Sequence, residues 1–590
     1  MGVNIVPHRL DPKGVIAVRN IKARKGEYAS YPPQVRGEIV DALARQGIKR
    51  LYAHQAEAVG HILSGRHTIV TTSTSSGKSL VYTIPVLNNL LYNPSGTALY
   101  ITPAKALAQN QRVAMVELTS RIQWPGPGPE VRVCDGDTPW EMRKEVLETS
   151  NIVLSTPDFM HATMLPRHRD WSVFFQNLSY VVLDEAHVFR GLLGASVCHV
   201  MRRLRRLCRY YKANPVFILC TATIGNPQEF AANLIGDECC AVEKETAPTG
   251  NRQVVLYEPP RYRDDNGDLR RRLTHLDGAR ALGRYVKDGQ RVIMFGRSRR
   301  IVESSYRKVL QDSPHLQGMI TPYKGTYTPA DRRLIEERLF SGDLKGCITT
   351  SALELGIDIG NLSVAILAGF PGSISSTWQQ WGRVGRNKQN SVAVLMAGED
   401  PLDLFLVRHP DYFFSRSFEK AVVDPNKTEF MAEHLLVAAR ELPLEKEDRS
   451  FWDQEYYYEV VKFLHRRGNL ELVSREPKKY CARGNVAIFG LRGESETFMA
   501  VGPEGKVFEQ FTRDAVLREA FPGAILFIKD RRFSVDRVDE GAKTIDLKPL
   551  PKNLNNYITL PHLLIEAKEL RQTGKEKSTA GLPPGPGNWK

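Results

Sequence analysis

A run of small residues ending in Gly-Lys-Ser has the residue types that bind a nucleoside triphosphate. It follows the apolar stretch 67–72 and consists of Ser73, Thr74, Ser75, Ser76, Gly77, Lys78 and Ser79. Backbone N–H groups in such a turn, together with the positive end of the following helix, surround phosphate oxygens. We expect Lys78 to bind the β- and γ-phosphates and the Ser79 hydroxyl to bind Mg²⁺. Thr72 stands where the strict pattern has glycine.

Two carboxylates directly follow a second apolar run, at residues 180–183. Asp184 and Glu185 would therefore emerge from a buried strand into a site. We expect Asp184 to hold Mg²⁺ and Glu185 to polarise the attacking water. Upstream, the amide of Gln55 carries donors and an acceptor on one group, so it is expected to bind the adenine edge. Together these residues predict a site for ATP hydrolysis.

A second set of candidate catalytic residues lies far along the chain, in the segment QQWGRVGR. Gln379 opens this segment, and Arg383 and Arg386 place two guanidiniums three residues apart. Planar cations suit the charge that spreads over a transferring phosphoryl group, and a solvated basic turn is the alternative. For the neighbouring Trp378 and Trp381, both lobe packing and stacking on a base remain open.

The pattern of apolar runs predicts an α/β protein with two tandem RecA-like parallel-sheet lobes, then a small helical or winged-helix domain and a β-rich domain. Short apolar strands alternate with amphipathic stretches in both halves, and helices dominate after about residue 425. The predicted divisions are 1–44 (N-terminal extension), 45–250 (lobe 1), 251–270 (linker), 271–424 (lobe 2), 425–484 (helical or winged-helix), 485–560 (β-rich) and 561–590 (disordered tail).

The two candidate sets thus belong to different lobes, so a productive site requires the lobes to close on ATP. Thr221 and Thr223, at the end of an apolar run, are expected to pass the nucleotide state between the lobes, with strand-end capping as the alternative. Two separately folded halves that close and open with each nucleotide make a motor.

The composition indicates a polyanionic partner and a reducing compartment. The net charge is +15, with 81 Lys and Arg against 66 Asp and Glu, which favours nucleic acid. The eight cysteines form no C-x-x-C pair, so we expect neither a zinc site nor a disulfide framework. We expect the protein to be intracellular. No signal peptide or membrane span is recognised. The arginines of the expected helix 201–212 either face solvent or bind a nucleic-acid strand.

The motifs SSGKS, TPAKALAQ, STPD, DEAH, TAT, TTSALELGID and QQWGRVGR occur in the order of a superfamily 2 DEAH-box helicase. More narrowly, the stretches DEAHVFRGLLGASVCHVMRRLRR, YKGTYTPADRRLIEERLFSGDLKG and FPGAILFIKDRRFSVDRVD resemble the MrfA and Hrq-type (RecQ-like) repair helicases. The resemblance implies 3′→5′ movement on single-stranded DNA, unwinding of tailed duplexes, and a role in DNA repair. Those relatives usually end in a four-cysteine zinc domain, whereas this chain has only Cys481 after residue 347.

The resemblance also implies roles for further residues. Gly356 and Asp358 join the expected nucleotide-binding set, and His187 is expected to couple the nucleotide to the lobe interface. Expected contacts with the nucleic-acid backbone are Thr102, Pro103, Lys105, Thr156, Thr349 and Ser351. Such contacts to phosphate carry no sequence information. Three alternatives stay open: an RNA helicase, a duplex translocase that separates no strands, and a non-enzymatic nucleic-acid-binding scaffold.

Overall fold

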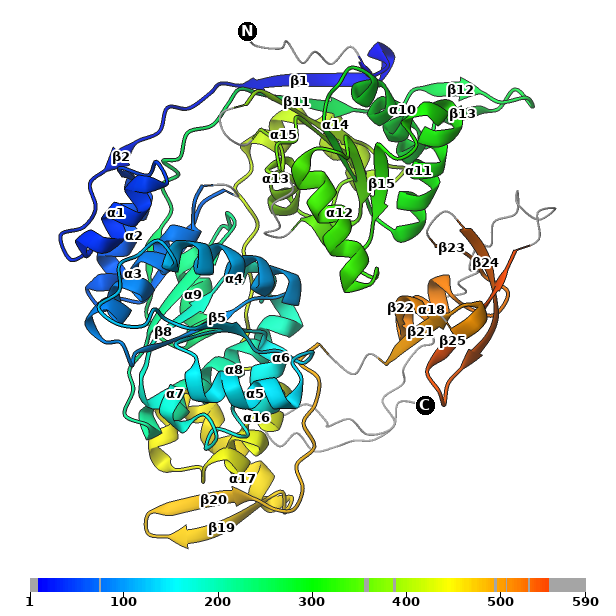
Figure 1. Cartoon of the computed structure of the whole chain (residues 1–590). Helices are drawn as coiled ribbons and strands as arrows, with labels where there is room; N and C mark the ends of the chain where they lie inside the picture. The colour runs from blue at the N-terminus through cyan, green and yellow to red at the C-terminus, as the bar shows by residue number, and fades with distance from the viewer. Residues whose placement is uncertain are drawn as a thin grey trace.

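The computed structural model describes residues 9–550 except 74–75, 355–359, 386–388, 493–495, 506 and 529–530. Two large sheets, each covered by helices, form two lobes that lie one above the other in Figure 1. Within these described residues, no helix is both long enough and apolar enough to cross a membrane. The expected α/β class with two parallel-sheet lobes is confirmed.

Lobe 1 contains a sheet of seven strands that are all parallel. Their side chains alternate between two buried clusters, as Ile69 and Val70 do, because successive residues of a strand face opposite sides. In sheet order the strands are β10 (Cys240–Val242), β4 (Thr68–Thr71), β9 (Val216–Thr221), β8 (Leu178–Leu183), β5 (Thr97–Ile101), β7 (Ile152–Ser155) and β6 (Val131–Val133).

Helices cover both faces of this sheet, as its apolar strands require. They are α1 (Gly37–Arg45), α2 (Ala53–Leu63), α3 (Ser79–Tyr92), α4 (Lys105–Thr119), α5 (Trp140–Thr149), α6 (Pro157–Phe159), α7 (Ser172–Gln176), α8 (Gly191–Tyr210) and α9 (Pro227–Ile235). A short ribbon of β2 (Tyr28–Ala29) and β3 (Leu51–Tyr52) attaches the chain before α1 to this lobe.

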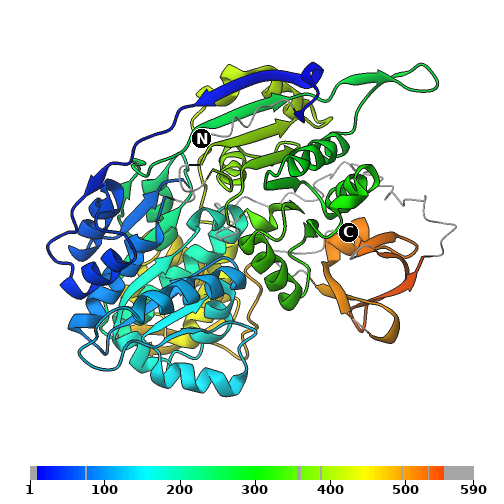
Figure 2. The same ribbon diagram turned by 45° about the horizontal axis from the view of Figure 1, so that its top comes forward.

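Lobe 2 also has seven strands, and its edge strand comes from the N-terminal extension. In order they are β1 (Val15–Ile21), β11 (Arg252–Tyr257), β18 (Ser391–Met396), β17 (Val364–Ala368), β14 (Val292–Gly296), β16 (Gly346–Thr349) and β15 (Ile320–Tyr323). Only β1 is antiparallel to its neighbour. Figures 1 and 2 both show this strand along the outer edge of lobe 2. Residues before lobe 1 in sequence therefore belong to both lobes.

The helices of lobe 2 lie on both faces of its sheet. They are α10 (Thr274–Lys287), α11 (Arg299–Asp312), α12 (Pro329–Ser341), α13 (Ile374–Trp381), α14 (Pro401–Arg408) and α15 (Pro410–Ser415).

Residues 251–270, predicted to be a linker, instead form a strand of the second sheet and most of a hairpin. The apolar run VVLY belongs to β11 inside the second sheet. Next, β12 (Arg261–Arg263) and β13 (Leu269–Arg271) form a hairpin that projects from the lobe. The turn contains Asn266-Gly267, with Gly267 at φ +84°. An Asn-Gly pair between two short runs is a hairpin signal, which the high charge of this stretch obscured.

Two smaller units follow lobe 2. The first has helices α16 (Thr428–Glu441) and α17 (Gln454–Arg466) and the hairpin of β19 (Leu470–Arg475) and β20 (Lys478–Ala482), the order of a winged helix. The second is a five-stranded sheet with α18 (Arg513–Glu519); its order is β22 (Val507–Thr512), β21 (Thr497–Val501), β25 (Thr544–Pro549), β24 (Arg531–Asp539) and β23 (Ile525–Ile528). In Figure 1 the winged-helix unit lies against lobe 1, and the five-stranded unit lies beside lobe 2.

Buried ion pairs attach the winged-helix unit to lobe 1. The guanidinium of Arg203, on α8, is fully buried against the Glu441 carboxylate at the end of α16. Arg206 donates to Asp448 at 2.8 Å and to the Ala438 carbonyl at 2.8 Å. Neither expectation for the arginine-rich helix holds for these two side chains, because the winged-helix unit covers the face that the sequence left open to solvent or to a strand.

A buried lysine attaches the five-stranded unit to lobe 2. Lys324, directly after β15, is 2% exposed, and its ammonium lies 2.7 Å from Glu303 of α11 and 2.9 Å from Glu509 of β22. The two carboxylates raise the pKa of Lys324 against the opposing effect of burial. Arg299 adds a cation–π contact at 4.9 Å from the Phe511 ring. Each small unit is thus held by a different lobe.

Reversing one charge in this contact is expected to release the five-stranded unit. In Glu509→Lys, two ammonium groups share a dry site, and breaking a buried pair costs ~3–5 kcal/mol. Calorimetry should then show a separate, lower melting transition, and limited proteolysis should cut within residues 483–492. Glu540→Lys, an exposed acid of the same unit, serves as the control. A single transition at the parent temperature in Glu509→Lys would contradict this role for Lys324.

Candidate functional site

The phosphate-binding turn joins β4 to the N-terminus of α3, as the sequence predicts. Its Gly77 has φ +77°, and a Cβ there would lie 2.5 Å from the Gln55 amide nitrogen. Glycine is needed both for this backbone conformation and for the close approach of Gln55. Thr74 and Ser75, two of the predicted binding residues, lie outside the described residues.

Lys78 lies over its own turn. The ammonium donates to the carbonyls of Thr72 and Ser73, at 2.8 Å each. Thr72, the departure from the strict glycine pattern, is buried and its hydroxyl lies 2.7 Å from the hydroxyl of Ser76. The extra side chain therefore bonds two residues of the turn to each other, and Lys78 directly precedes Ser79, where α3 begins.

Gln55 connects α2 to this turn. Its amide nitrogen donates to the Gly77 carbonyl at 2.8 Å, and its amide oxygen accepts from the Tyr52 N–H at 2.9 Å. With the side chain 2% exposed, the amide is held by these two bonds. Contact with adenine stays a prediction; the structure shows that Gln55 positions the phosphate-binding turn.

The acidic pair lies at the carboxyl end of β8, in the middle of the sheet. Asp184 accepts from the Tyr82 hydroxyl at 3.3 Å and from the Gln111 amide at 3.2 Å. Burial and, after it, the charge of Glu185 raise the pKa of Asp184 to about 7, against the opposing charge of Lys78. A buried carboxylate beside a second one favours a cation, and with the Ser79 hydroxyl it offers the hard oxygen ligands that Mg²⁺ prefers.

Glu185 has the left-handed backbone conformation, with φ +50° and ψ +43°. This conformation is uncommon for a residue other than glycine. The conformation turns the chain sharply after β8, so that the carboxylate of Glu185 lies 3.6 Å from Nδ1 of His187. The pair and the histidine therefore form one buried group.

His187 connects the two lobes. Its Nε2 lies 2.8 Å from the amide nitrogen of Gln379 in lobe 2, and its Nδ1 lies 3.3 Å from the backbone nitrogen of Ala222. Burial lowers the pKa of His187 to about 4, so the ring is neutral near pH 7. Because an amide nitrogen only donates, Nε2 of His187 accepts this bond from Gln379.

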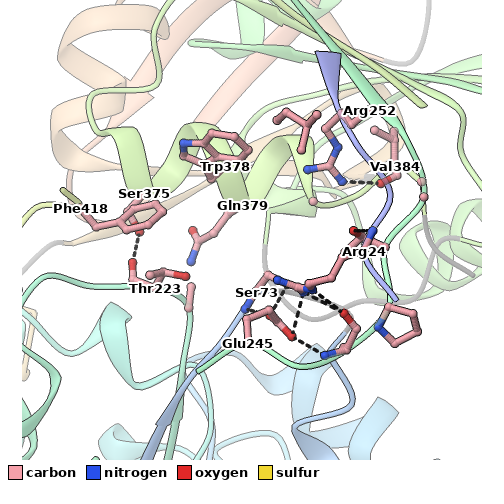
Figure 3. A pocket seen from close by; sticks show the side chains of 18 residues that line it. Arg24, Ser73, Thr223, Glu245, Arg252, Ser375, Trp378, Gln379, Val384 and Phe418 are labelled. Carbon is pink, nitrogen blue, oxygen red and sulfur yellow. Dashed lines mark hydrogen bonds and ion pairs between the residues drawn. The ribbon is translucent and has the colours of Figure 1, made fainter. Parts of the chain in front are cut away.

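A second contact between the lobes lies beside this one. The hydroxyl of Ser375, on α13, donates to the Thr223 carbonyl at 2.9 Å (Figure 3). Thr221 is fully buried at the end of β9, and its hydroxyl bonds the Ala222 carbonyl at 2.9 Å. A cavity of ≈ 250 Å³ opens between the lobes here, lined by Ser73, Thr223 and Gln379 among others.

Of the two candidate arginines of lobe 2, the structure describes Arg383 but not Arg386. Arg383 is 1% exposed and donates to the backbone carbonyl of Glu354 within its own lobe. The Glu354 carboxylate accepts from Ser376 at 2.6 Å and Gln380 at 2.9 Å. Arg386, Gly356 and Asp358 lie outside the described residues. A contact of Arg383 and Arg386 with phosphate stays a prediction.

The expected nucleic-acid contacts lie at strand ends of both sheets, and most of their side chains face inward. Thr102, Pro103, Thr156 and Thr349 are buried, whereas Lys105 and Ser351 are exposed. The Thr102 hydroxyl bonds the Ala104 carbonyl at 3.1 Å, Thr156 caps α6, and Lys105 pairs with Asp137 at 2.6 Å. Contact with phosphate stays a prediction for all six.

Sequence reasoning missed two residues at these edges. The Glu419 carboxylate accepts from the Ile374 and Ser375 N–H groups at the start of α13, at 2.6 and 3.1 Å, while its carbonyl accepts from Gly225 of lobe 1 at 3.0 Å. Arg492 donates to the Pro103 carbonyl at 3.1 Å. A single acid or base without a motif gives no signal in the sequence. Trp381 is fully buried in the core of lobe 2, as packing predicts.

The comparisons with known proteins agree with this geometry. Residues 52–230 match the DEAD/DEAH box helicase model, and residues 277–388 match the helicase conserved C-terminal domain. The uncharacterized ATP-dependent helicase YprA of Bacillus subtilis is 37% identical over 83% of this chain and 67% of its own length. The helicase hrq1 of Schizosaccharomyces pombe is 36% identical over 88% of this chain and 50% of its own. This chain thus spans only half of the yeast protein.

A solved structure of the helicase MrfA bound to DNA superposes with a TM-score of 0.84 at 32% identity, over 91% of this chain and 72% of that one. The similarity extends beyond the two lobes, which make up less than that share of the chain. The two family models and these relatives together identify the chain as a member of the superfamily 2 ATP-dependent helicases, in the family that includes YprA, hrq1 and MrfA.

Proposed function

We propose that this protein uses ATP hydrolysis to move 3′→5′ along single-stranded DNA and to separate duplexes, in the service of DNA repair. The observation that carries this proposal is the buried bond between His187 of the DEAH segment and Gln379 of lobe 2. It makes the acidic pair and the position of lobe 2 interdependent, which an ATPase without moving parts would not need.

Each lobe would supply separate parts of the reaction. Lys78 and the N-terminus of α3 bind the phosphates, while Asp184 and Ser79 hold Mg²⁺. Glu185 orients the attacking water. When bound, Mg·ATP supplies the phosphoryl group whose release removes the charge that holds the lobes together. Arg383 and Arg386 approach from lobe 2 only after its turn has moved, since Arg383 is bonded within its own lobe.

DNA is proposed as the track because of the relatives. The sequence of MrfA is 32% identical to this chain, and MrfA has been solved bound to DNA. The net charge of +15 supports a polyanion without distinguishing DNA from RNA. Direction of movement and a role in repair rest on the resemblance to the MrfA and Hrq-type helicases. The exposed Lys105 and Ser351 lie at strand ends in different lobes, so a strand that touches both would be moved when the lobes close.

Displacement of a labelled strand from tailed duplexes tests direction and motor activity together. We expect a duplex with a 3′ single-stranded tail to be unwound and one with a 5′ tail to be left intact. Lys78→Ala should abolish displacement, because the phosphates lose their ammonium. Displacement that survives Lys78→Ala, or turnover that nucleic acid does not stimulate, would refute the proposal. ATP turnover stimulated by duplex, without displacement, would indicate a translocase instead.

Stimulation of ATP turnover by single-stranded DNA and by RNA of the same sequence separates the two tracks. We expect DNA to give the larger stimulation. Binding should weaken with salt by about 0.7 in log–log slope for each phosphate contacted on a single strand. Equal or greater stimulation by RNA would favour the RNA helicase.

Removing the bond between the lobes should uncouple turnover from movement. In His187→Ala and in Gln379→Ala we expect stimulation by nucleic acid to fall about 5-fold or more, the usual scale of a coupling free energy of ~1–3 kcal/mol. The double variant should lose no more than either single variant, because both remove the same bond. Additive losses would show that the two side chains act separately.

A further inference from the structure

Two segments of the described chain run side by side between the lobes. Residues 243–251 lead from β10 of lobe 1 to β11 of lobe 2, and residues 22–27 lead from β1 of lobe 2 to β2 of lobe 1. Arg24 and Thr249 exchange two backbone bonds of 3.1 Å, and the Glu27 N–H donates to the Thr246 carbonyl at 3.0 Å. The hinge is therefore a paired ribbon, and any rotation of the lobes must bend both chains together.

The carboxylate of Glu245 joins this hinge to the phosphate-binding turn. One oxygen accepts from both the N–H and the hydroxyl of Ser73, at 2.7 Å each. The other accepts from the Ala247 N–H at 3.1 Å and lies 3.5 Å from the Arg24 guanidinium. Arg24 also donates to the Ala247 carbonyl at 3.0 and 2.8 Å. Figure 3 shows these groups at one end of the cavity between the lobes.

The next hinge residue is bonded to the other side of the nucleotide site. The Thr246 hydroxyl lies 2.6 Å from Nδ1 of His54 and accepts from the His54 N–H at 3.1 Å. His54 precedes Gln55, whose amide bonds Gly77. Two consecutive hinge residues thus hold the first residue of the phosphate-binding turn and, through α2, its glycine.

The peptide unit that joins Thr72 to Ser73 is shared between the hinge and the lysine expected to bind phosphate. Its N–H, on Ser73, bonds Glu245, and its carbonyl, on Thr72, accepts from Lys78 at 2.8 Å. When Lys78 turns to phosphate, that carbonyl loses its charged donor. At the same time a polyanion arrives near the carboxylate of Glu245, which Arg24 partly neutralises. Both changes act on the same peptide and on the same hinge carboxylate.

We propose that Glu245, held by Arg24, is a positioning residue that transmits the state of the phosphate-binding turn to the paired hinge, so that nucleotide binding biases lobe closure from the hinge side. The contacts of His187 and Ser375 act at the opposite wall of the cavity, where α13 meets lobe 1. Closure would then be controlled at both walls. The inference rests on ATP binding at the turn, and its consequence for movement rests on the proposed helicase function.

The hinge also supplies a matched control. Lys244 and Glu27 form an ion pair of 2.6 Å between the same two segments, with side chains 70% and 52% exposed. This pair bridges the ribbon one residue away from Glu245. A general need for a stiff hinge would make both pairs matter, whereas transmission from the turn requires only Glu245 and Arg24.

Closure is measured in the full chain by energy transfer between dyes at exposed Glu57 of α2 and Lys287 of α10. The probe is a non-hydrolysable ATP analogue at saturating concentration, with single-stranded DNA present. We expect the closing equilibrium constant to fall about 5-fold in Glu245→Gln, which would lower a closed fraction of about 0.8 to about 0.5. Arg24→Lys should give a smaller fall, and Lys244→Ala none. Saturation removes any effect of weaker nucleotide affinity.

An unchanged closed fraction in Glu245→Gln, or an equal fall in Lys244→Ala, overturns the proposal. Glu245→Gln keeps the size of the side chain and an acceptor for Ser73, and thermal melting verifies its fold. Should Glu245→Gln fail to fold, Arg24→Lys, which leaves Glu245 in place, decides by the same measure. In active variants, ATP consumed per strand displaced should rise about 5-fold. Because closure needs no strand displacement, its result stands even if the parent protein unwinds nothing.

Discussion

The arrangement depends on one constraint: the acidic pair must stay buried and yet respond to the other lobe. Asp184 is removed from solvent at the end of β8, where burial and Glu185 raise its pKa to about 7. A neutral histidine lies beside the pair and bonds Gln379 across the cleft. In such a buried polar group, a side chain that loses its hydrogen-bond partner costs free energy, so each partner must stay in place. The strained backbone at Glu185 and the contacts of Tyr82 and Gln111 follow from that requirement.

Buried ion pairs also attach the winged-helix and five-stranded units to the lobes. The winged-helix unit is attached to lobe 1 through Arg203 and Arg206, and the five-stranded unit is attached to lobe 2 through Lys324. Buried ion pairs add little net stability, but they are intolerant of other pairings and so favour one docking geometry. With each unit fixed to a different lobe, lobe closure would also displace the two units relative to each other.

The hinge shows how the N-terminal extension contributes to the motor. A single linker would let the lobes rotate about any of its bonds. Pairing with residues 22–27 restricts that freedom, and β1 extends the sheet of lobe 2 by one antiparallel strand. The phosphate-binding turn then touches the hinge through Ser73 and Glu245, so the two regions are joined by hydrogen bonds and not only by the chain.

The local parts of the site could be predicted from the amino-acid sequence. The turn before Lys78, the acids after β8 and the order of lobes are written in strand–turn–helix patterns a few residues long, because backbone conformation there depends on near neighbours. Which distant groups meet could be read only from the folded chain. The arginines of α8 look like a solvated face until residues more than 200 positions later cover them, and Glu245 carries no motif at all. Elements remote in the chain decide whether a charged side chain is buried and which group it pairs with. The sequence therefore shows where a charged residue stands but not which partner it has.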